Sequence, residues 1–180
     1  ETAADIVNTA TEEELSDIIF TYGEERFARG IARAIVAARS KERILTTGAL
    51  VAAIKAGTPR QYHERKINPA TKTFQALRIA ANDEIGAMRE GLAAALSALA
   101  PGGRLAIISF HSIEDRIVKG ILRDAAETGL GMMNPRKPIV PTREEILANR
   151  RARSAKLRVF ERAAVATESV GVSASMLSYA

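Results

Sequence analysis

The sequence predicts an α/β fold, and two adjacent segments carry that prediction. The segment from Leu99 to Lys119 contains, in order, a helix end, a glycine turn, an apolar strand, a polar loop and another helix, which is half of an α/β unit. Residues 74–99 before it place apolar side chains three and four positions apart, the spacing of one helix face. Because ligands of open α/β sheets bind beyond the carboxyl ends of strands, we expect chemistry at residues 109–112.

The composition is that of a globular protein without cysteine chemistry. With 180 residues and 47% hydrophobic content, the chain can bury a core. No apolar run approaches the ~18 residues of a membrane span, and the first residues lack the features of a signal peptide, so a cytoplasmic location is expected. The absence of cysteine, with only His63 and His111 present, excludes thiolate and histidine-rich metal sites.

Three helices are predicted in the first third of the chain, and no strand is expected before residue 70. Thr11 and the glutamates after it have the T-x-x-E form of a capping box, so a helix begins there and ends near Gly23. A second helix is expected over residues 24–39, with its arginines on one side and its apolar residues on another. A third begins at Thr46 and is closed by Gly57.

One long helix is expected to follow a polar loop. Residues 59–69 have no sustained apolar period and predict the loop. The apolar seam over residues 74–99 predicts a continuous helix that packs on a sheet. A coiled coil is the alternative for this seam, but Gly86 and Gly91 within it favour the sheet.

Residues 105–110 predict a parallel strand that is covered by helices on both faces. The glycine turn at residues 101–103 precedes this strand, so we interpret it as a turn into the sheet and not as a cofactor cradle. Ser112 is predicted to cap the following helix, with Asp115 in the position that Glu usually holds in a capping box.

The last third predicts a short edge strand, a short helix and a closing strand. The edge strand is expected over residues 136–140, interrupted by Pro138. Thr142 begins the helix, and residues 156–161 alternate as a weak closing strand. Residues 163–180 carry no strong signal and are expected to form a mobile tail.

Positive charge is concentrated near the carboxyl end. The formal net charge is +5, and residues 134–162 hold nine basic and three acidic side chains, which supply +6. Such a basic face suits a polyanion such as RNA, and a solvated surface is the alternative. Aromatic residues are only 4% of the chain and tryptophan is absent, which argues against a single-strand binder built on stacking platforms.

Four blocks of the chain resemble one family when they are taken together and in order. They are residues 21–28 (TYGEERFA), 69–79 (PATKTFQALRI), 101–119 (with SFHSIEDR) and 153–158 (RSAKLR). This pattern resembles the bacterial cytosine-N4 methyltransferases of small-subunit ribosomal RNA, which are class I enzymes that use S-adenosylmethionine. The resemblance runs from about residue 1 to residue 162.

The resemblance implies a partial Rossmann-like class I methyltransferase sheet with a helical insertion domain. Residues 1–73 would be the helical insertion, concerned with substrate recognition, and residues 74–162 the carboxyl-terminal part of the methyltransferase domain. The activity implied is N4-methylation of a cytosine, with small-subunit ribosomal RNA or the small ribosomal subunit as partner. The family's cofactor-binding positions and its active-site aspartate are expected upstream of Glu1, so the chain alone is expected to be inactive.

Two departures from the family pattern stand out. Asn68 and Lys72 occupy positions where the family most often has His and Arg, which could weaken an RNA or interdomain contact. The stretch from Ala163 onward matches nothing in the family. The alternative function is a non-catalytic RNA-binding or interaction module that has kept the helical region and the basic face.

The candidate catalytic residues gather at the end of the predicted strand. His111 could exchange a proton near the target amine, and a structural histidine that binds the loop is the alternative. Ser109 and Asp115 are further candidates, although cap spacing alone already accounts for Asp115. The candidate RNA-binding residues are basic; they are Lys66, Lys72, Arg78, Arg116, Lys119, Arg150, Arg151, Arg153, Lys156 and Arg158. An ion pair to the sheet is the alternative for Lys66, Lys72 and Arg78.

Overall fold

The structure is a computed structural model and describes residues 1–63 and 68–164. The chain divides between Glu90 and Gly91 into two compact units, which we call the helical unit (residues 1–90) and the sheet unit (residues 91–164). The sequence places the end of the helical region at residue 73. The observed division instead lies inside one helix, α7 (Glu84–Ala98).

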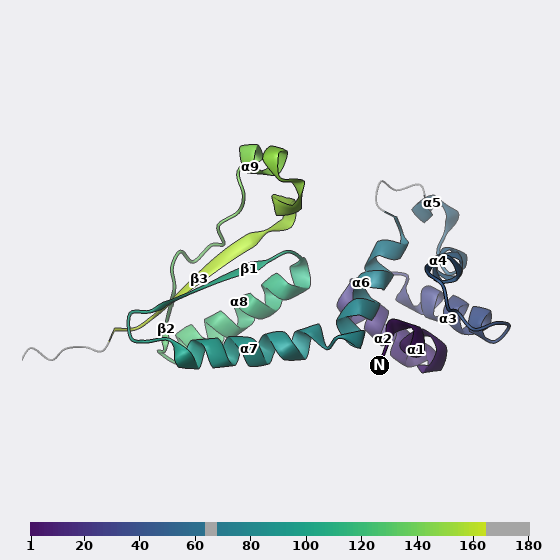
Figure 1. The fold of residues 1–180 in the computed structure, drawn as a ribbon, viewed down its shortest axis with the longest axis horizontal. Coiled ribbons are helices and arrows are strands. Elements are labelled where there is room, and N and C mark those ends of the chain that lie inside the picture. The colour runs from purple at the N-terminus through teal and green to yellow at the C-terminus, as the bar shows by residue number, and fades with distance from the viewer. Residues whose placement is uncertain (64–67, 165–180) are drawn as a thin grey trace, which may run out of the picture. The chain divides into compact units, whose positions relative to one another are not determined.

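Helices build the whole described part of the helical unit, which has no strand there, as predicted (Figure 1). They are α1 (Ala3–Thr9), α2 (Glu12–Gly23), α3 (Ala28–Arg39), α4 (Thr47–Ala56), α5 (Arg60–His63), α6 (Ala70–Ala81) and the first part of α7. Of these, α5 lies in the segment that the sequence predicts as a loop. In the described residues of either unit, no helix is long and apolar enough to cross a membrane.

Side-chain caps explain where these helices begin. The Thr11 hydroxyl accepts from the Glu14 amide and the Glu14 carboxylate accepts from Thr11, which confirms the predicted capping box of α2. Thr46 caps α4, also as predicted. Helix α1 was not predicted; it begins with an equivalent box in which Asp5 takes the place of Glu and pairs with Thr2.

The start of α3 lies four residues later than predicted. Glu24 adopts a left-handed backbone conformation with φ 49° and ends α2. The carboxylate of Glu25 then accepts a hydrogen bond from the Phe27 amide at 3.0 Å. This turn delays the helix until Ala28.

The core of the helical unit lies between α2, α3, α4 and α6. Its most buried members include Ile19, Ile31, Ile54 and Leu77, and burying one such side chain contributes about 1.5–3 kcal/mol. Phe74 is partly buried against this core.

Two glycines let α3 and the end of α4 approach closely. A Cβ atom added at Gly30 would lie 2.5 Å from the carbonyl oxygen of Gly57, and one added at Gly57 would lie 2.5 Å from that of Gly30. Any larger residue would force the two backbones apart.

The prediction of one continuous helix over residues 74–99 is wrong. The structure has two helices there, α6 and α7, with a break at Asn82 and Asp83. Asp83 is left-handed with φ 45°, and its carboxylate accepts from the Gly86 amide at 3.2 Å. The apolar seam continues across the break, so periodicity alone did not show it, whereas short polar residues that favour caps mark it.

The sheet unit contains a three-stranded antiparallel sheet in the order β1-β3-β2. Helix α8 contacts all three strands and lies along the sheet (Figure 1). Its elements after α7 are β1 (Arg104–Ser109), α8 (Ser112–Glu127), β2 (Gly131–Met133), α9 (Arg143–Ala148), the 3-10 helix η1 (Arg150–Ser154) and β3 (Lys156–Arg162). The predicted closing strand is thus the central strand of the three, and Thr142 caps α9 as predicted.

The expectation of a parallel β1 covered on both faces is not met in the described residues. The strand pairs antiparallel with β3, from Arg104 opposite Glu161 to Ser109 opposite Lys156. Alternate residues are exposed, and Ile108 is 58% exposed. The continuous apolar run therefore overstated the burial of the strand in this chain.

The predicted edge strand over residues 136–140 is also wrong. Only Ile139 forms a bridge there, to Leu157, with backbone hydrogen bonds in both directions. Strand β2 was missed, since three residues are too few for a periodic signal. Most of the predicted tail, residues 165–180, lies outside the described residues.

Candidate functional site

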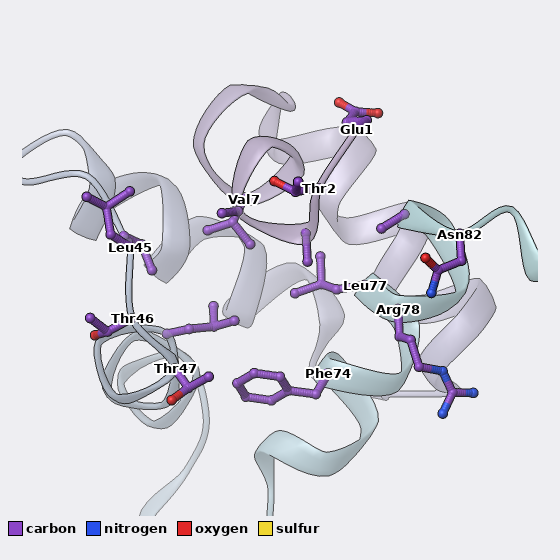
Figure 2. Close-up of a pocket in the computed structure, with 15 residues that line it drawn as sticks. Glu1, Thr2, Val7, Leu45, Thr46, Thr47, Phe74, Leu77, Arg78 and Asn82 are labelled. Atoms are coloured by element: carbon purple, nitrogen blue, oxygen red, sulfur yellow. The ribbon is translucent and has the colours of Figure 1, made fainter.

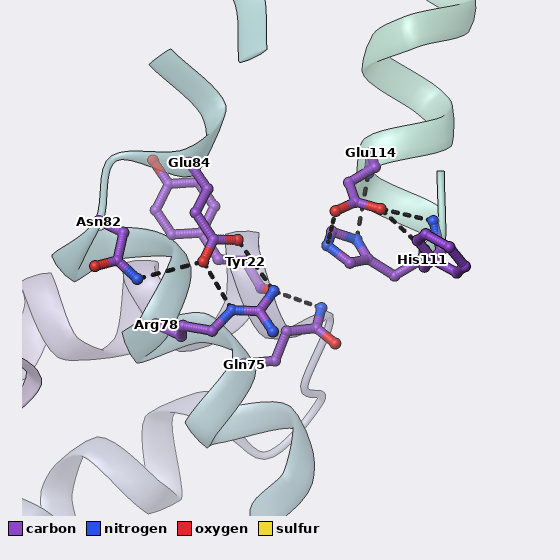
Figure 3. A network of polar contacts seen from close by, with 8 residues as sticks. Tyr22, Gln75, Arg78, Asn82, Glu84, His111 and Glu114 are labelled. Carbon is purple, nitrogen blue, oxygen red and sulfur yellow. Dashed lines mark hydrogen bonds and ion pairs between the residues drawn. The ribbon is translucent and has the colours of Figure 1, made fainter. Parts of the chain in front are cut away.

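The loop that joins β1 to α8 is held by a capping box built from His111 and Glu114. His111 Nδ1 accepts from the Glu114 amide at 3.3 Å, and Glu114 Oε2 accepts from the amides of Phe110 at 2.7 Å and His111 at 3.2 Å (Figure 3). His111 Nε2 lies 3.0 Å from Glu114 Oε1, although this contact does not have hydrogen-bond geometry. The imidazole is therefore oriented by the box, with Nδ1 as the acceptor.

The predicted cap of α8 is wrong by one residue. Ser112 is the first residue of the helix, and His111 is the N-cap. The box closes with Glu114 in the usual Glu position, which leaves Asp115 outside it. The capping acceptor is a histidine ring nitrogen, and histidine is not among the residues that usually cap helices, which are Ser, Thr, Asp and Asn.

Asp115 instead forms the central ion pair of the sheet unit. Its carboxylate accepts from Arg158 Nε and Nη2 at 2.8 and 3.2 Å, and from Lys156 Nζ at 2.8 Å. The Asp115 and Arg158 side chains are only 11% and 8% exposed. This pair ties α8 to the central strand β3.

The pKa of Asp115 results from two opposing influences. Burial raises it, and the hydrogen bonds and charges of Arg158 and Lys156 lower it by more, so the pKa lies below its ordinary value of 3.8. Asp115 is consequently a carboxylate at neutral pH that is already bound to two cations. This arrangement suits it to hold structure more than to take a proton.

The three candidate catalytic residues lie within one short stretch but do not form a catalytic triad. Ser109 is buried at the end of β1. In the described part of the chain, the side-chain contacts of His111 go to Glu114 and those of Asp115 go to Arg158 and Lys156. A catalytic role for any of the three stays a prediction.

The glycine turn before β1 leads into the sheet, as predicted. Gly102 has φ 75°, which favours glycine, and its amide donates to the Arg162 carbonyl in β3. Each of the described strands is followed by residues other than a glycine-rich turn: Phe110, Asn134 and Ala163. The described residues therefore offer no turn of the kind that cradles a nucleotide cofactor. They also contain no cluster of side chains that could hold a metal ion.

The candidate RNA-binding residues of the sheet unit separate into two groups. Arg150, Arg151 and Arg153 are exposed on η1, while Arg116 and Lys119 are exposed on α8. Arg158 is buried and Lys156 is partly buried, and both bind Asp115. The charge pattern could not separate these groups. Lys156 and Arg158 lie two positions apart in β3 and so point to the same face, towards α8, and only the fold shows which face that is.

The candidates in the helical unit have intramolecular partners. Lys72 Nζ donates to the Glu24 carbonyl at 2.7 Å. Arg78 forms a double hydrogen bond with Glu84 at 2.7 and 3.0 Å, across the break between α6 and α7 (Figure 3). Arg78 thus forms an ion pair within the helical unit, and not the predicted alternative of an ion pair to the sheet. Lys66 lies outside the described residues.

A cavity of about 480 Å³ opens in the helical unit between α1, α4 and α6 (Figure 2). Val7, Leu50, Phe74 and Leu77 give it a mainly apolar lining, with Arg78 at its border. It contains none of the candidate catalytic residues.

One polar arrangement in the helical unit, around Glu25 and Tyr62, was not predicted from the sequence. The side chain of Glu25 is fully buried, and its carboxylate accepts a hydrogen bond from the Tyr62 hydroxyl. Arg26, which is exposed, places its guanidinium 4.6 Å from the ring centre of Phe27 and 5.5 Å from that of Tyr62. Residues 26 and 62 are far apart in the sequence, so no local pattern indicated the contact.

Comparison with known proteins agrees with the resemblance of the four sequence blocks. The model of the MraW methylase family matches residues 1–163. Proteins named ribosomal RNA small subunit methyltransferase H are 55% identical over 91% of the chain in Deinococcus radiodurans and 48% identical over 89% in Neorickettsia sennetsu. A protein of that name in Brevibacillus brevis is 46% identical over 89% of the chain. The chain spans about half the length of these curated relatives, 51% to 56%.

Proposed function

Because the chain belongs to the MraW methylase family, we propose that it is part of an enzyme that methylates N4 of a cytosine in small-subunit ribosomal RNA. The methyl donor would be S-adenosylmethionine. The family match over nearly the whole chain carries this proposal, and the names of the relatives support the substrate class.

The chain would contribute one wall of the active site. S-adenosylmethionine supplies an electrophilic methyl group, so transfer to an amine depends on orientation and charge more than on a strong base. The loop from Ser109 to Glu114 lies at the carboxyl end of β1, where α/β sheets bind their ligands. The His111–Glu114 box would keep this loop rigid while the RNA base is held.

The cofactor would be held by the part of the relatives that this chain does not span. The described strand ends do not fit a nucleotide cofactor, since none is followed by a glycine-rich turn. In the described residues, β1 also has a strand partner on one edge only, and both its residue Ile108 and the following Phe110 are exposed. An unpaired edge with an apolar face is suited to docking of further sheet structure.

The RNA backbone would meet the exposed cations of the sheet unit. We place Arg150, Arg151, Arg153, Arg116 and Lys119 in this role, because these side chains are exposed. Arg158 is left out, since its guanidinium is occupied by Asp115 in the interior. Phosphate contacts of this kind give an affinity that falls steeply with salt.

A chimeric protein tests the proposal. In it, this chain replaces the matching half of the Deinococcus radiodurans relative, with which it shares 55% identity. Purified small-subunit RNA and S-adenosylmethionine carrying a tritiated methyl group are the substrates. We expect tritium to enter the RNA, and a folded chimera that binds the cofactor but leaves the RNA unlabelled would contradict the proposal.

The exposed arginines of η1 favour a second candidate, an RNA-binding module without catalysis. Calorimetric titration of the chain alone with S-adenosylmethionine tests whether the chain is an intact enzyme. Neither the partial enzyme nor the RNA-binding module should bind this cofactor, whereas an intact enzyme should. Micromolar binding would contradict the placement of the cofactor site. The module is favoured if the chain binds RNA in a salt-dependent way, Ala at Arg150, Arg151 and Arg153 abolishes that binding, and the chimera is inactive.

A further inference from the structure

Arg26 is held against two aromatic rings on the surface of the helical unit. Its guanidinium carbon lies 4.6 Å from the ring centre of Phe27 and 5.5 Å from that of Tyr62. The two rings meet edge to face, with centres 4.9 Å apart and planes at 72°. A guanidinium that lies over ring faces keeps the N–H donors at its edge available for an anion that presents two oxygens.

Buried polar groups hold both rings in place. The carboxylate of Glu25, which is fully buried, accepts from the Phe27 amide at 3.0 Å and from the Tyr62 hydroxyl. One carboxylate thereby connects the α2–α3 turn, which carries Arg26, to α5, which carries Tyr62. Arg26 is thus oriented before any ligand arrives, which lowers the entropy lost on binding.

The charge of Arg26 is not neutralised within the described residues. No carboxylate there lies within ion-pair distance of its guanidinium, in contrast to Arg33, which pairs with Glu12 at 3.4 Å. Lys72 donates to the Glu24 carbonyl in the same turn, and Arg60 begins the short helix that carries Tyr62. Acids and bases are therefore both present around Arg26: Glu24 is exposed in the same turn, and the carboxylate of Glu25 is buried beneath the rings.

From this geometry we infer that Arg26 is a binding residue for a phosphodiester of the RNA substrate, with Glu25 and Tyr62 as its positioning residues. The ligand class rests on the proposed function. A phosphate presents two oxygens that match the paired N–H donors of a guanidinium. The helical unit would therefore have its own phosphate contact, separate from the basic residues of the sheet unit.

Fluorescence anisotropy of the full chain with a labelled fragment of small-subunit ribosomal RNA tests this inference. For Arg26→Gln we expect an affinity loss of about three- to tenfold. The slope of log affinity against log salt should also become shallower by ~0.7–0.9, the change for one lost phosphate contact. Arg26→Lys keeps the charge without the planar fork, so it should retain most of the slope while losing part of the affinity.

Arg33→Gln is the matched control, since it removes the same charge from a residue that already has a carboxylate partner. It should leave the affinity within about twofold of the parent value and the slope unchanged. Circular dichroism and thermal melting of each variant show whether the fold is kept. If the parent chain binds RNA and the folded Arg26→Gln variant binds with the same affinity and slope, the inference is overturned. If the parent chain does not bind RNA, the inference is overturned as well, while methyl transfer by the chimera tests the proposed function separately.

Discussion

Replacing Asp115 with Asn should destabilise the sheet unit more than any other single change to a charged residue on α8. The substitution removes the negative charge that faces Arg158 and Lys156. It also replaces one of the two oxygens that accept the hydrogen bonds of 2.8, 3.2 and 2.8 Å by an NH2 group, which cannot accept from either cation. The Arg158 guanidinium would stay buried without its counter-charge. Breaking one partner of a buried ion pair costs about 3–5 kcal/mol, and we expect a loss in this range.

Native-state hydrogen exchange of the β3 and α8 amides is the appropriate assay. It reports on the sheet unit directly, whereas a chain of two compact units need not unfold in one step. Asp124→Asn is the control on the same helix, because its ion pair with Arg123 is 60% to 68% exposed and should contribute less than about 1 kcal/mol. The double variant Asp115→Asn with Arg158→Met removes both charges and should recover part of the loss.

This prediction is refuted if the β3 and α8 amides of Asp115→Asn exchange at the parent rate. It is also refuted if the stability lost in Asp115→Asn differs from that lost in Asp124→Asn by less than ~1 kcal/mol. Either result would mean that α8 is held to β3 by its apolar contacts alone.

Three further predictions concern pH, the loop histidine and the glycine contact. Burial raises the pKa of Asp115, but its bonds to Arg158 and Lys156 lower the pKa by more. The contribution of Asp115 to the stability of the sheet unit is therefore complete above about pH 4 and is lost as the pH falls through the lowered pKa. Hydrogen exchange of the β3 amides should accelerate as the pH falls through that range. A similar acceleration in the Asp115→Asn variant would contradict the assignment of this pH dependence to Asp115. His111→Ala should cost about 1 kcal/mol in α8 stability by exchange, while His111→Asn retains the cap and most methyl transfer in the chimera; a stable but inactive Asn variant would instead assign the ring a proton-transfer role. Gly30→Ala should lower stability in urea unfolding by about 1–3 kcal/mol because its Cβ would meet the Gly57 carbonyl. At Gly48 an added Cβ would meet only Thr46 Oγ1, at 4.0 Å, so Gly48→Ala should not destabilise, and equal effects of the two substitutions would refute the close approach.

Helix starts with a conventional cap could be predicted from the sequence. The Thr11 and Thr46 caps and the Thr142 start each depend on residues within three positions of one another, and the structure confirms all three. The break at Asp83 was missed because the apolar period continues through it. Its signal was the short polar pair at residues 82–83, which the periodicity outweighed.

The candidate site was predicted in position but not in the roles of its residues. The segment from Ser109 to Asp115 does follow a strand and begin a helix. Which residue caps and which faces the sheet differed, because His111 and Glu114 close the box one position before the predicted pair. The partner of Asp115 lies 43 residues away on β3, and only tertiary structure brings the two together.

Burial of charge was the hardest property to predict. Arg158 lies in a basic segment and was counted among the RNA contacts, but the pairing of β3 with β1 turns its side chain towards α8. Arg26 was not counted among the RNA contacts, because its local sequence does not show the rings that lie beside it. Its two rings come from residues 27 and 62, which meet only in the folded helical unit.

The most direct test of the central claim is the identity of the product made by the chimera. Small-subunit RNA treated with the chimera and S-adenosylmethionine is digested to nucleosides and analysed by mass spectrometry against authentic standards. We expect N4-methylcytidine with the chimera and none when the chain is supplied alone. A methyl group on another base or on cytosine carbon, or N4-methylcytidine formed by the chain alone, would contradict this expectation.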